Sequence, residues 1–565
     1  MKRYTVAVLF VGALACTDSN APSPPPVPPP PAPGASFAIE PALDTVLIDQ
    51  LVEFVAQHAD STEDQWSISD SSIARLSIPK DRGRAMLQGL RPGTVTIKAR
   101  HQGDSGQATL VIRQPVSFVV APGLDTIPVG SGVRLDAAVR DSVDQWVISD
   151  TSLARLGPHY GSYAYVVTRA PGTVTVIARR GVDSGVARLV VLEPAPPAGW
   201  DVINLGVLDA VLGRPVAIND SGTIVGLLFF NPHPLQTVSP DFDLGWQYEG
   251  QYEKRGFIYS HGMMRQLSGL DTVPLAIGPS GTIVGTDLTQ PLGQFLIWEP
   301  GAGPRPLSNG TYHWAWGGRI IGVNARGDIL ASIGEDGPES STALYQTGRL
   351  WRSDSVVDLG QLNPSVAKRT LPMAWNTRGQ IVGFSTVAVI YRAGDNGYPA
   401  HPFLWENGVM RDLGILGSSP CGEPVDCGGG VARAINIDGT VVGQSTAVSS
   451  YLRAFIWENG EMRDLGPFPG QNTNALAIND RGQVLGTVDR GPTFVWKNGE
   501  TQIVPFDGSL LGPNGEVVGT RDGHIFIWEA GQVTDLGEGS PIAMNSRGEI
   551  IGTRGALPTL WRKKP

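Results

Sequence analysis

Short runs in which apolar and polar residues alternate make up most of the chain after residue 35. Residues 94–97 read Thr-Val-Thr-Ile, and Gly, Pro and Asp-Ser-Gly separate such runs. An alternation with a period of two predicts β-strands with one buried face, and closely spaced turn residues predict antiparallel neighbours. The pattern therefore predicts an all-β chain.

Two segments repeat each other at a distance of about 80 residues. DQWSISDSSIARL at 64–76 matches DQWVISDTSLARL at 144–156, and RPGTVTIKAR at 91–100 matches APGTVTVIAR at 170–179. Repeats of this length with regular turns predict two antiparallel β-sandwiches, over 35–114 and 115–195. Trp66 and Trp146 are expected to pack between the sheets rather than to stack on a sugar.

These two copies resemble the bacterial Ig-like domain, group 2. The resemblance rests on the Trp followed by Ser-Asp and Ser-(Ile/Leu)-Ala, on Pro-Gly-Thr-Val-Thr and on the closing strand, and it covers about residues 36–193. It implies modules that act mostly as spacers and adhesive elements of surface proteins.

From residue 201 onward a different unit repeats, in its tightest copies about every 33 residues. Its first half carries three aligned columns. A turn glycine recurs at Gly222, Gly281, Gly327, Gly379, Gly439, Gly482, Gly515 and Gly548. Three residues earlier stand Asn219, Gly278, Asn324, Asn376, Asn436, Asn479, Gly512 and Asn545, which we expect to need a positive φ. Four residues after the turn glycine stand Gly226, Gly285, Ala331, Gly383, Gly443, Gly486, Gly519 and Gly552, which predict a close approach of backbones.

The second half of the unit has an aromatic column followed, eight or nine residues later, by an apolar residue. The aromatic residues are Tyr259, Trp298, Trp351, Trp405, Trp457, Trp496, Trp528 and Trp561. Each unit thus predicts two hairpins, and eight four-stranded units predict a β-propeller of eight blades, with seven as the alternative. The last unit lacks a fourth strand, and residues 202–206 match it. A strand donated from the beginning of the region would close the ring. The predicted fold is two Ig-like β-sandwiches followed by a propeller over 201–565.

The repeats resemble the HAF-repeat family of bacterial extracellular proteins. The motifs that carry the resemblance are AIND-x-G-x-(I/V)-(V/L)-G, then AFIWENG, then M-R-DLG, over about residues 202–562. The resemblance implies export and transfers no activity and no functional residue.

The beginning of the chain predicts export and lipid anchoring. Lys2 and Arg3 precede an apolar run that ends in Ala13-Leu14-Ala15-Cys16, which resembles a lipobox except that Ala13 stands where Leu is usual. We expect a signal peptide over 1–15, acylation of Cys16 and a Pro-rich tether over 16–34. Cleavage by ordinary signal peptidase, which would give a secreted protein, is the alternative.

Charge and motif content exclude several functions. The net charge is −10 and no long basic cluster occurs, so nucleic acid is not an expected partner, and the membrane is expected to be contacted through the lipid alone. The eight His residues lack metal-ligand spacing, and His401 is interpreted as an isolated loop residue. The turns 219–222 and 436–439 are interpreted as plain turns rather than calcium loops. We predict no metal, no cofactor and no catalytic residue.

The insertions in the propeller region are predicted to lie on one face. They fall at 227–254, 309–318, 363–370, 386–401 and 417–430, always at connections 2–3 or 4–1 of a blade. Two are aromatic, and one of these also contains Phe229 and Phe230. The candidate ligand-binding residues are Trp246, Tyr248, Tyr252, Tyr312, His313, Trp314 and Trp316. The alternative is that they cover the core of the propeller.

The two remaining cysteines, Cys421 and Cys427, are separated by five residues in a predicted insertion. In an oxidising compartment such thiols form disulfides, so we predict a bridge between them.

The leading functional hypothesis is a non-enzymatic surface binding or adhesin-like lipoprotein, with a protein or polysaccharide ligand on the long-loop face. The alternatives are a hydrolase or lyase acting on polysaccharide, which would need paired carboxylates in a funnel, and a purely structural envelope protein. The sequence does not determine the oligomeric state.

Overall fold

The computed structural model describes residues 37–565, apart from 58–63, 80–82, 102, 115–116, 140–142, 182, 231–252, 268–271, 288–292, 313–317, 336–344, 353–354, 367–368, 389, 393–394, 398, 418–427, 448–450 and 467. The elements of the described residues are β-strands, numbered β1 to β50, as predicted. None of the described segments is a helix long and apolar enough to cross a membrane. The chain divides into two compact units, 1–116 and 117–565, which are described separately.

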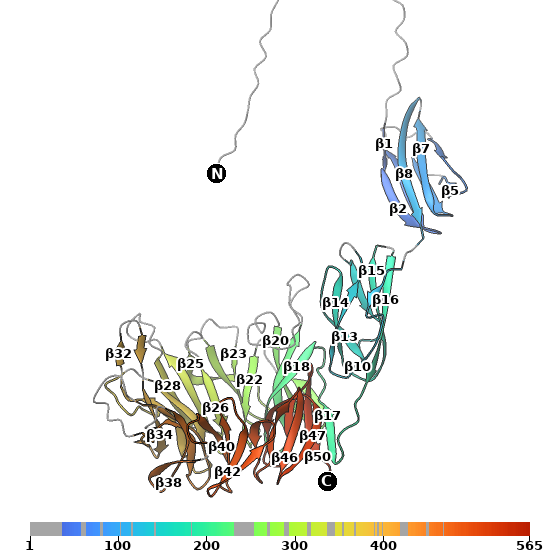
Figure 1. Ribbon diagram of the computed structural model, residues 1–565. Helices are drawn as coiled ribbons and strands as arrows, with labels where there is room; N and C mark the ends of the chain where they lie inside the picture. Colours follow the sequence, from blue (N-terminus) through green and yellow to red (C-terminus); the bar gives the residue numbers. More distant parts are fainter. Residues whose placement is uncertain are drawn as a thin grey trace, which may run out of the picture. The chain divides into compact units, whose positions relative to one another are not determined.

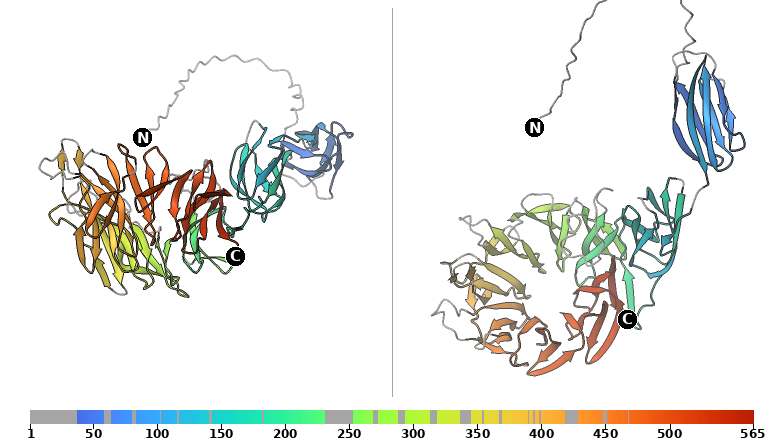
Figure 2. Two further views of the ribbon diagram at one scale, coloured as in Figure 1. Left: turned by 60° about the horizontal axis from the view of Figure 1, so that its bottom comes forward. Right: turned by 45° about the horizontal axis from the view of Figure 1, so that its top comes forward.

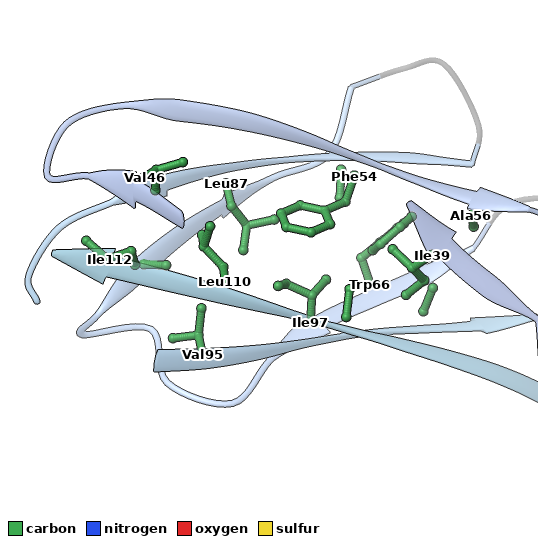
Figure 3. Packing of buried hydrophobic residues seen from close by; sticks show 14 residues of the cluster. Ile39, Val46, Phe54, Ala56, Trp66, Leu87, Val95, Ile97, Leu110 and Ile112 are labelled. Carbon is green, nitrogen blue, oxygen red and sulfur yellow. The ribbon is translucent and has the colours of Figure 1, made fainter. Parts of the chain in front are cut away.

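The first unit contains one β-sandwich. Its strands are β1 (Ala38–Glu40), β2 (Leu43–Leu47), β3 (Leu51–Gln57), β4 (Gln65–Ile68), β5 (Ala74–Ser77), β6 (Arg84–Gly89), β7 (Gly93–His101) and β8 (Asp104–Arg113). They form the sheets β1-β3-β6-β5 and β2-β8-β7-β4. Figure 3 shows Phe54, Trp66, Leu87 and Ile97 packed between them. The expected core role of Trp66 is confirmed.

The second Ig-like module begins the second unit. Its strands are β9 (Val120–Ala121), β10 (Leu124–Pro128), β11 (Gly132–Ala137), β12 (Gln145–Ile148), β13 (Ala154–Tyr160), β14 (Tyr163–Thr168), β15 (Gly172–Arg180) and β16 (Asp183–Leu192). They form the sheets β13-β14-β11-β9 and β10-β16-β15-β12, and Trp146 is buried between them. The predicted pair of sandwiches is confirmed, but the sheets are not wholly antiparallel, because β2 pairs parallel with β8 and β10 pairs parallel with β16.

The repeated Ser-Asp motif forms a turn in both modules. The Asp70 carboxylate accepts hydrogen bonds from the Ser72 hydroxyl at 2.7 Å and from the Ser72 N–H at 2.8 Å. Asp150 makes the same two bonds with Ser152, at 2.6 and 2.8 Å. The hydroxyl bond and then the backbone bond lower the pKa of each Asp from its ordinary value.

We predict that Ser72→Ala raises the pKa of Asp70 towards its ordinary value and leaves Asp150 unchanged as the internal control. Carboxylate NMR titration of the full chain measures both. A lowered pKa favours folding while the carboxylate is ionised, so this contribution exists above the ordinary pKa and is lost as the pH falls through the folded value. Equal pKa values for the two Asp residues in the variant would contradict the structure.

Eight four-stranded antiparallel sheets follow among the described residues, and Figure 2 shows them arranged in a ring. Blade 1 consists of β18 (Leu212–Ile218), β19 (Ile224–Phe230), β20 (Glu253–Ser260) and β21 (Met263–Gln266), and blade 2 of β22 (Thr272–Ile277), β23 (Ile283–Asp287), β24 (Gly293–Trp298) and β25 (Pro304–Tyr312). Blade 3 consists of β26 (Arg319–Val323), β27 (Ile329–Glu335), β28 (Tyr345–Arg352) and β29 (Ser355–Asp358), and blade 4 of β30 (Thr370–Trp375), β31 (Ile381–Thr386), β34 (Ala400–Glu406) and β35 (Val409–Asp412). Between β31 and β34 lies a small hairpin of β32 (Ile390–Arg392) and β33 (Asp395–Gly397).

Blades 5 to 8 complete the ring. Blade 5 consists of β36 (Gly430–Ile435), β37 (Val441–Thr446), β38 (Leu452–Glu458) and β39 (Glu461–Asp464), and blade 6 of β40 (Thr473–Ile478), β41 (Val484–Val488), β42 (Thr493–Lys497) and β43 (Glu500–Val504). Blade 7 consists of β44 (Asp507–Leu511), β45 (Val517–Arg521), β46 (His524–Glu529) and β47 (Gln532–Glu538). Blade 8 consists of β48 (Ser540–Met544), β49 (Ile550–Arg554) and β50 (Leu557–Lys563), together with β17 (Trp200–Asn204). The predicted all-β propeller fold is confirmed, with eight blades rather than seven.

The ring closes through the donated strand, as predicted. β17 pairs antiparallel with β50, with Val202 opposite Trp561, and Figure 1 shows the two strands together. The Asn204 carboxamide accepts the Gly206 N–H at 2.9 Å, as Asp412 and Asp464 do for the glycines of their own Asp-Leu-Gly motifs. Residues 202–206 thus supply the missing fourth strand together with its turn.

The expected reason for the Asn column is wrong. The turn glycines have φ between +72° and +97°, but the column three residues earlier is not in the positive-φ region. Asn219 instead accepts the Thr223 N–H at 3.0 Å and donates to the carbonyl of Gly278 in the next blade at 3.1 Å. Asn376, Asn479 and Asn545 likewise donate to the same column of the following blade, at 2.9 to 3.1 Å. Asn is used because one carboxamide stabilises a turn and also links two blades.

The predicted close approach at the Gly column is confirmed. A Cβ at Gly443 would lie 2.0 Å from the carbonyl oxygen of Val431, and one at Gly383 2.0 Å from that of Leu371. Facing this column, the first strand of each blade carries a bulge, as between Ala432 and Ala434. The glycine provides the space into which the bulged strand folds.

Candidate functional site

Most of the residues that the sequence proposed as sites lie outside the described residues. These are Cys16, Trp246, Tyr248, Tyr252, His313, Trp314, Trp316, Cys421 and Cys427. Tyr312 ends β25, so the outer strand of blade 2 extends into the segment that was expected to be a loop.

Two further expectations about the insertions are wrong. Phe229 and Phe230 belong to β19, and Phe229 is buried against Val167 of the second Ig-like module. His401 is not an isolated loop residue, because it lies on β34 and its Nδ1 is 2.8 Å from the Asp412 carboxylate. Burial would raise the pKa of Asp412, but hydrogen bonds from His401 and from the Gly414 N–H hold the pKa below its ordinary value.

A depression of about 380 Å³ lies on the face of the propeller that carries the tight turns, opposite to the face of the long insertions. Its lining comes from the first strands and the first turns of blades 2 to 6, which surround the ring axis. We call it the channel mouth, and its lining residues are Pro279, Val323, Asn324, Ala325, Arg326, Trp375, Asn376, Thr377, Ile435, Ile437 and Asp480. It therefore exists only when the ring is assembled.

Trp375 is the unusual residue of the channel mouth. The same position, one residue before the Asn column, holds Ile218, Ile277, Val323, Ile435, Ile478, Leu511 and Met544 in the other blades. The indole is half-buried, and its Nε1 would lie 3.4 Å from a Cβ at Gly322 of blade 3. The position of Gly322 is Ala217, Ala276, Ala374, Ala434, Ala477 and Ala543 in six of the other blades. Trp375 and Gly322 thus both depart from the repeat, and they lie next to each other. The glycine leaves space for the indole ring at the channel mouth.

Polar groups surround this indole. Arg326 is exposed, and its Nε lies 3.4 Å from the carboxylate of Asp328. One oxygen of the exposed Asp480 carboxylate accepts a hydrogen bond from the Ile437 N–H at 2.9 Å, and this bond orients the carboxylate. The channel mouth therefore offers an aromatic surface, a guanidinium and an oriented carboxylate.

Positive charge also gathers on the first strands of blades 3 and 5. Burial lowers the pKa of Arg433, and the positive charge of Arg319 lowers it further. The Arg433 Nε donates to the Asn474 carboxamide at 3.0 Å. Arg433 lies in the bulge of its strand, and at the equivalent position the other blades mostly carry aliphatic residues, such as Val216 and Ile542.

The groups that line the channel mouth determine which ligands it could hold. Among the described residues that line the channel mouth, Asp480 supplies the only carboxylate. A hydrolase of glycosidic bonds needs two, about 5 to 10 Å apart. An aromatic ring with polar neighbours instead suits a ligand that has apolar faces and polar edges.

Two larger hollows of about 730 and 690 Å³ flank blade 1 on the same face. They are lined mainly by the turns that every blade repeats, such as Ser221, His261 and Gly281. The smaller of the two is also lined by Tyr259, where the other seven blades have Trp, so this departure from the repeat replaces one aromatic ring with another.

No family model and no curated protein matches the chain. Among solved structures it is similar to the β-propeller domain of the Trilobed protease from Pyrococcus furiosus, at 10% identity and a TM-score of 0.35, covering 62% of this chain and 94% of that one. It is also similar to an acylaminoacyl peptidase of Pyrococcus horikoshii, at 12% and 0.36, over 60% and 57% of the two chains. An I-band fragment of titin matches at 12% and 0.19, over 48% and 94%. These similarities carry no argument about activity.

Sequence reasoning missed the channel mouth although the signal was present. Aligning the position before the Asn column shows Trp375 among aliphatic residues.

Proposed function

We propose that the chain is an exported, lipid-anchored surface protein whose propeller binds a glycan at the channel mouth. The observation that carries this proposal is Trp375, a half-buried indole that replaces an aliphatic residue and for which Gly322 leaves space. The apolar face of a sugar ring packs on an indole, and the surrounding hydroxyls need donors and acceptors. Arg326 and Asp480 are in place to supply them.

The rest of the chain fits a surface location. Acylation of Cys16 would hold the protein in the envelope, and the tether over 16–34 would extend it outward. The resemblance to bacterial Ig-like modules and to HAF repeats supports an extracellular role. The aromatic residues of the long insertions are the alternative site, for which Trp246, Trp314 and Trp316 are the test positions.

The proposal is tested with the mature full-length chain on an array of bacterial, plant and animal glycans, with cell-wall preparations as further probes. We expect retention of a defined class of glycan without release of new reducing ends or unsaturated sugars. Product release would favour the hydrolase or lyase. Binding to protein components alone would identify a protein ligand instead and contradict the glycan proposal.

A further inference from the structure

The second Ig-like module contacts the propeller along one of its ends, within the compact unit 117–565. Arg155 donates to the carbonyl and the carboxylate of Asp209, and Arg169 donates to the carbonyls of Leu208 and Ala210. Glu193, just after β16, forms an ion pair with Arg554 at 2.5 Å. Apolar residues are buried between these polar contacts, since Val129 and Val191 share a core cluster with Leu205, Val207 and Leu557.

These contacts fall on the two segments that close the ring. Residues 205–211 follow directly after β17, and residues 554–557 form the turn between β49 and β50, the strand to which β17 pairs. The Ala556 N–H donates to the carbonyl of Gly130 at 2.8 Å. The Asn204 side chain, at the end of β17 itself, donates to the carbonyl of Arg169 at 3.2 Å. The module therefore contacts both sides of the closing seam.

The first Ig-like module serves as an internal comparison. Aligning the two repeats places Asp49 at the position of Gly130, Gln88 at that of Val167 and Leu90 at that of Arg169. In the second module each of these residues contacts the propeller: Gly130 through Ala556, Val167 in a buried cluster with Leu212, and Arg169 through Ala210. Three positions at which the copies differ thus lie where the second copy meets the propeller, whereas Arg155, which contacts Asp209, is matched by Arg75 in the first module.

Gly130 gives the clearest evidence that this end of the second Ig-like module is adapted to contact the propeller. Asp49 and Gly130 both have a positive φ, at 68° and 90°, so the turn itself accepts a side chain. A Cβ at Gly130, however, would lie 2.3 Å from the carbonyl oxygen of Arg554. Glycine is required by the contact with the propeller rather than by the turn.

The side chain of Arg169 also suits the contact between the second Ig-like module and the propeller. Burial, and then the positive charge of Arg155, lower its pKa to about 10, and the negative charge of Asp209 opposes both effects. A guanidinium placed in such surroundings needs acceptors, and the backbone carbonyls after β17 supply them. Leu90 at this position of the first module could not make these bonds.

From this we infer that the second Ig-like module is a clasp that holds the donated strand β17 in the ring, and that the two copies have different roles. The clasp is independent of the proposed glycan site, and it stabilises the seam at which an eight-bladed ring would open. Because the tether and the first module precede the clasp in the chain, a pull from the anchor reaches the clasp before it reaches β17.

The test exchanges residues between the modules in the mature full-length chain. Gly130→Asp and Arg169→Leu introduce the residues of the first module, and Asp49→Gly with Leu90→Arg is the reverse control. Hydrogen exchange followed by mass spectrometry reports the amides of β17 and β50. We expect these amides to exchange at least tenfold faster in Gly130→Asp and in Arg169→Leu, with the amides of β40 and β41 unchanged, and no effect in the control.

A second variant guards against simple misfolding of the module. Arg169→Leu combined with Glu193→Gln leaves the Gly130 turn intact and removes only side-chain contacts. Protection of β15 and β16 shows that the module is folded. If β17 keeps its wild-type exchange rate in this variant while β15 and β16 stay protected, the module is a spacer and the inference is overturned.

Discussion

Deletion of residues 200–204 is expected to cause the largest loss of stability of any short change in the propeller. It removes β17, leaves the backbone of β50 as an open edge and removes the Trp200 side chain, which is 4% exposed. Loss of a buried aromatic side chain alone costs about 3 to 5 kcal/mol, and the unpaired edge adds a surface that pairs with other chains. Denaturant unfolding and light scattering should show a large drop in midpoint together with aggregation.

A deletion of equal length in the tether, residues 25–29, is the matched control for this change. It shortens the chain by the same amount and removes no residue of the ring. An unchanged unfolding midpoint in the deletion of 200–204 would mean that the ring does not depend on the donated strand.

Gly443→Val is expected to destabilise the propeller nearly as strongly. Its φ is not in the positive region, so the backbone conformation suits any residue. The obstacle is space, because a Cβ would meet the Val431 carbonyl oxygen at 2.0 Å and the Phe455 ring at 3.0 Å. Neither group belongs to a flexible side-chain end, so the bulge in β36 must be rebuilt at a cost of about 3 kcal/mol. Thermal unfolding of the full chain measures the loss.

Gly303→Ala is the control, since a Cβ at that exposed turn would meet no atom within 4 Å. Its melting temperature should equal that of the wild type. Equal stability of Gly443→Val and Gly303→Ala would contradict the close approach of the two backbones.

The architecture was predictable from the sequence because its determinants are local and repeated. A turn glycine, a strand glycine and a Trp recur in register, so one chain supplies eight aligned copies of the unit, in which only Ala331 and Tyr259 depart from these three residue types. The closing strand was predictable for the same reason, since Asn204-Leu205-Gly206 copies the Asp-Leu-Gly motif of other blades. The number of blades followed from counting the turn glycines.

What the sequence did not predict depends on contacts between repeats. Asn219 was expected to need a positive φ. Its observed role depends on a hydrogen bond to Gly278, which lies 59 positions away in another blade, so the local sequence does not reveal it. His401 looked isolated because Asp412 faces it from the neighbouring strand. Trp375 and Gly322 lie in different blades, and the contact between Gly130 and Arg554 joins two domains. Periodicity describes each unit well, but it carries no information about these pairs.

The most direct test of the proposed function is the affinity of the full-length chain for the glycan class that the array retains, measured by isothermal titration calorimetry. The variants are Trp375→Ala at the channel mouth and the triple change Trp246→Ala, Trp314→Ala and Trp316→Ala on the insertion face. Removing the indole that stacks on the sugar should weaken binding at least about tenfold, as expected for a central aromatic contact. The triple variant should bind like the wild type. Binding that survives Trp375→Ala and disappears in the triple variant would contradict the account and place the site on the insertion face.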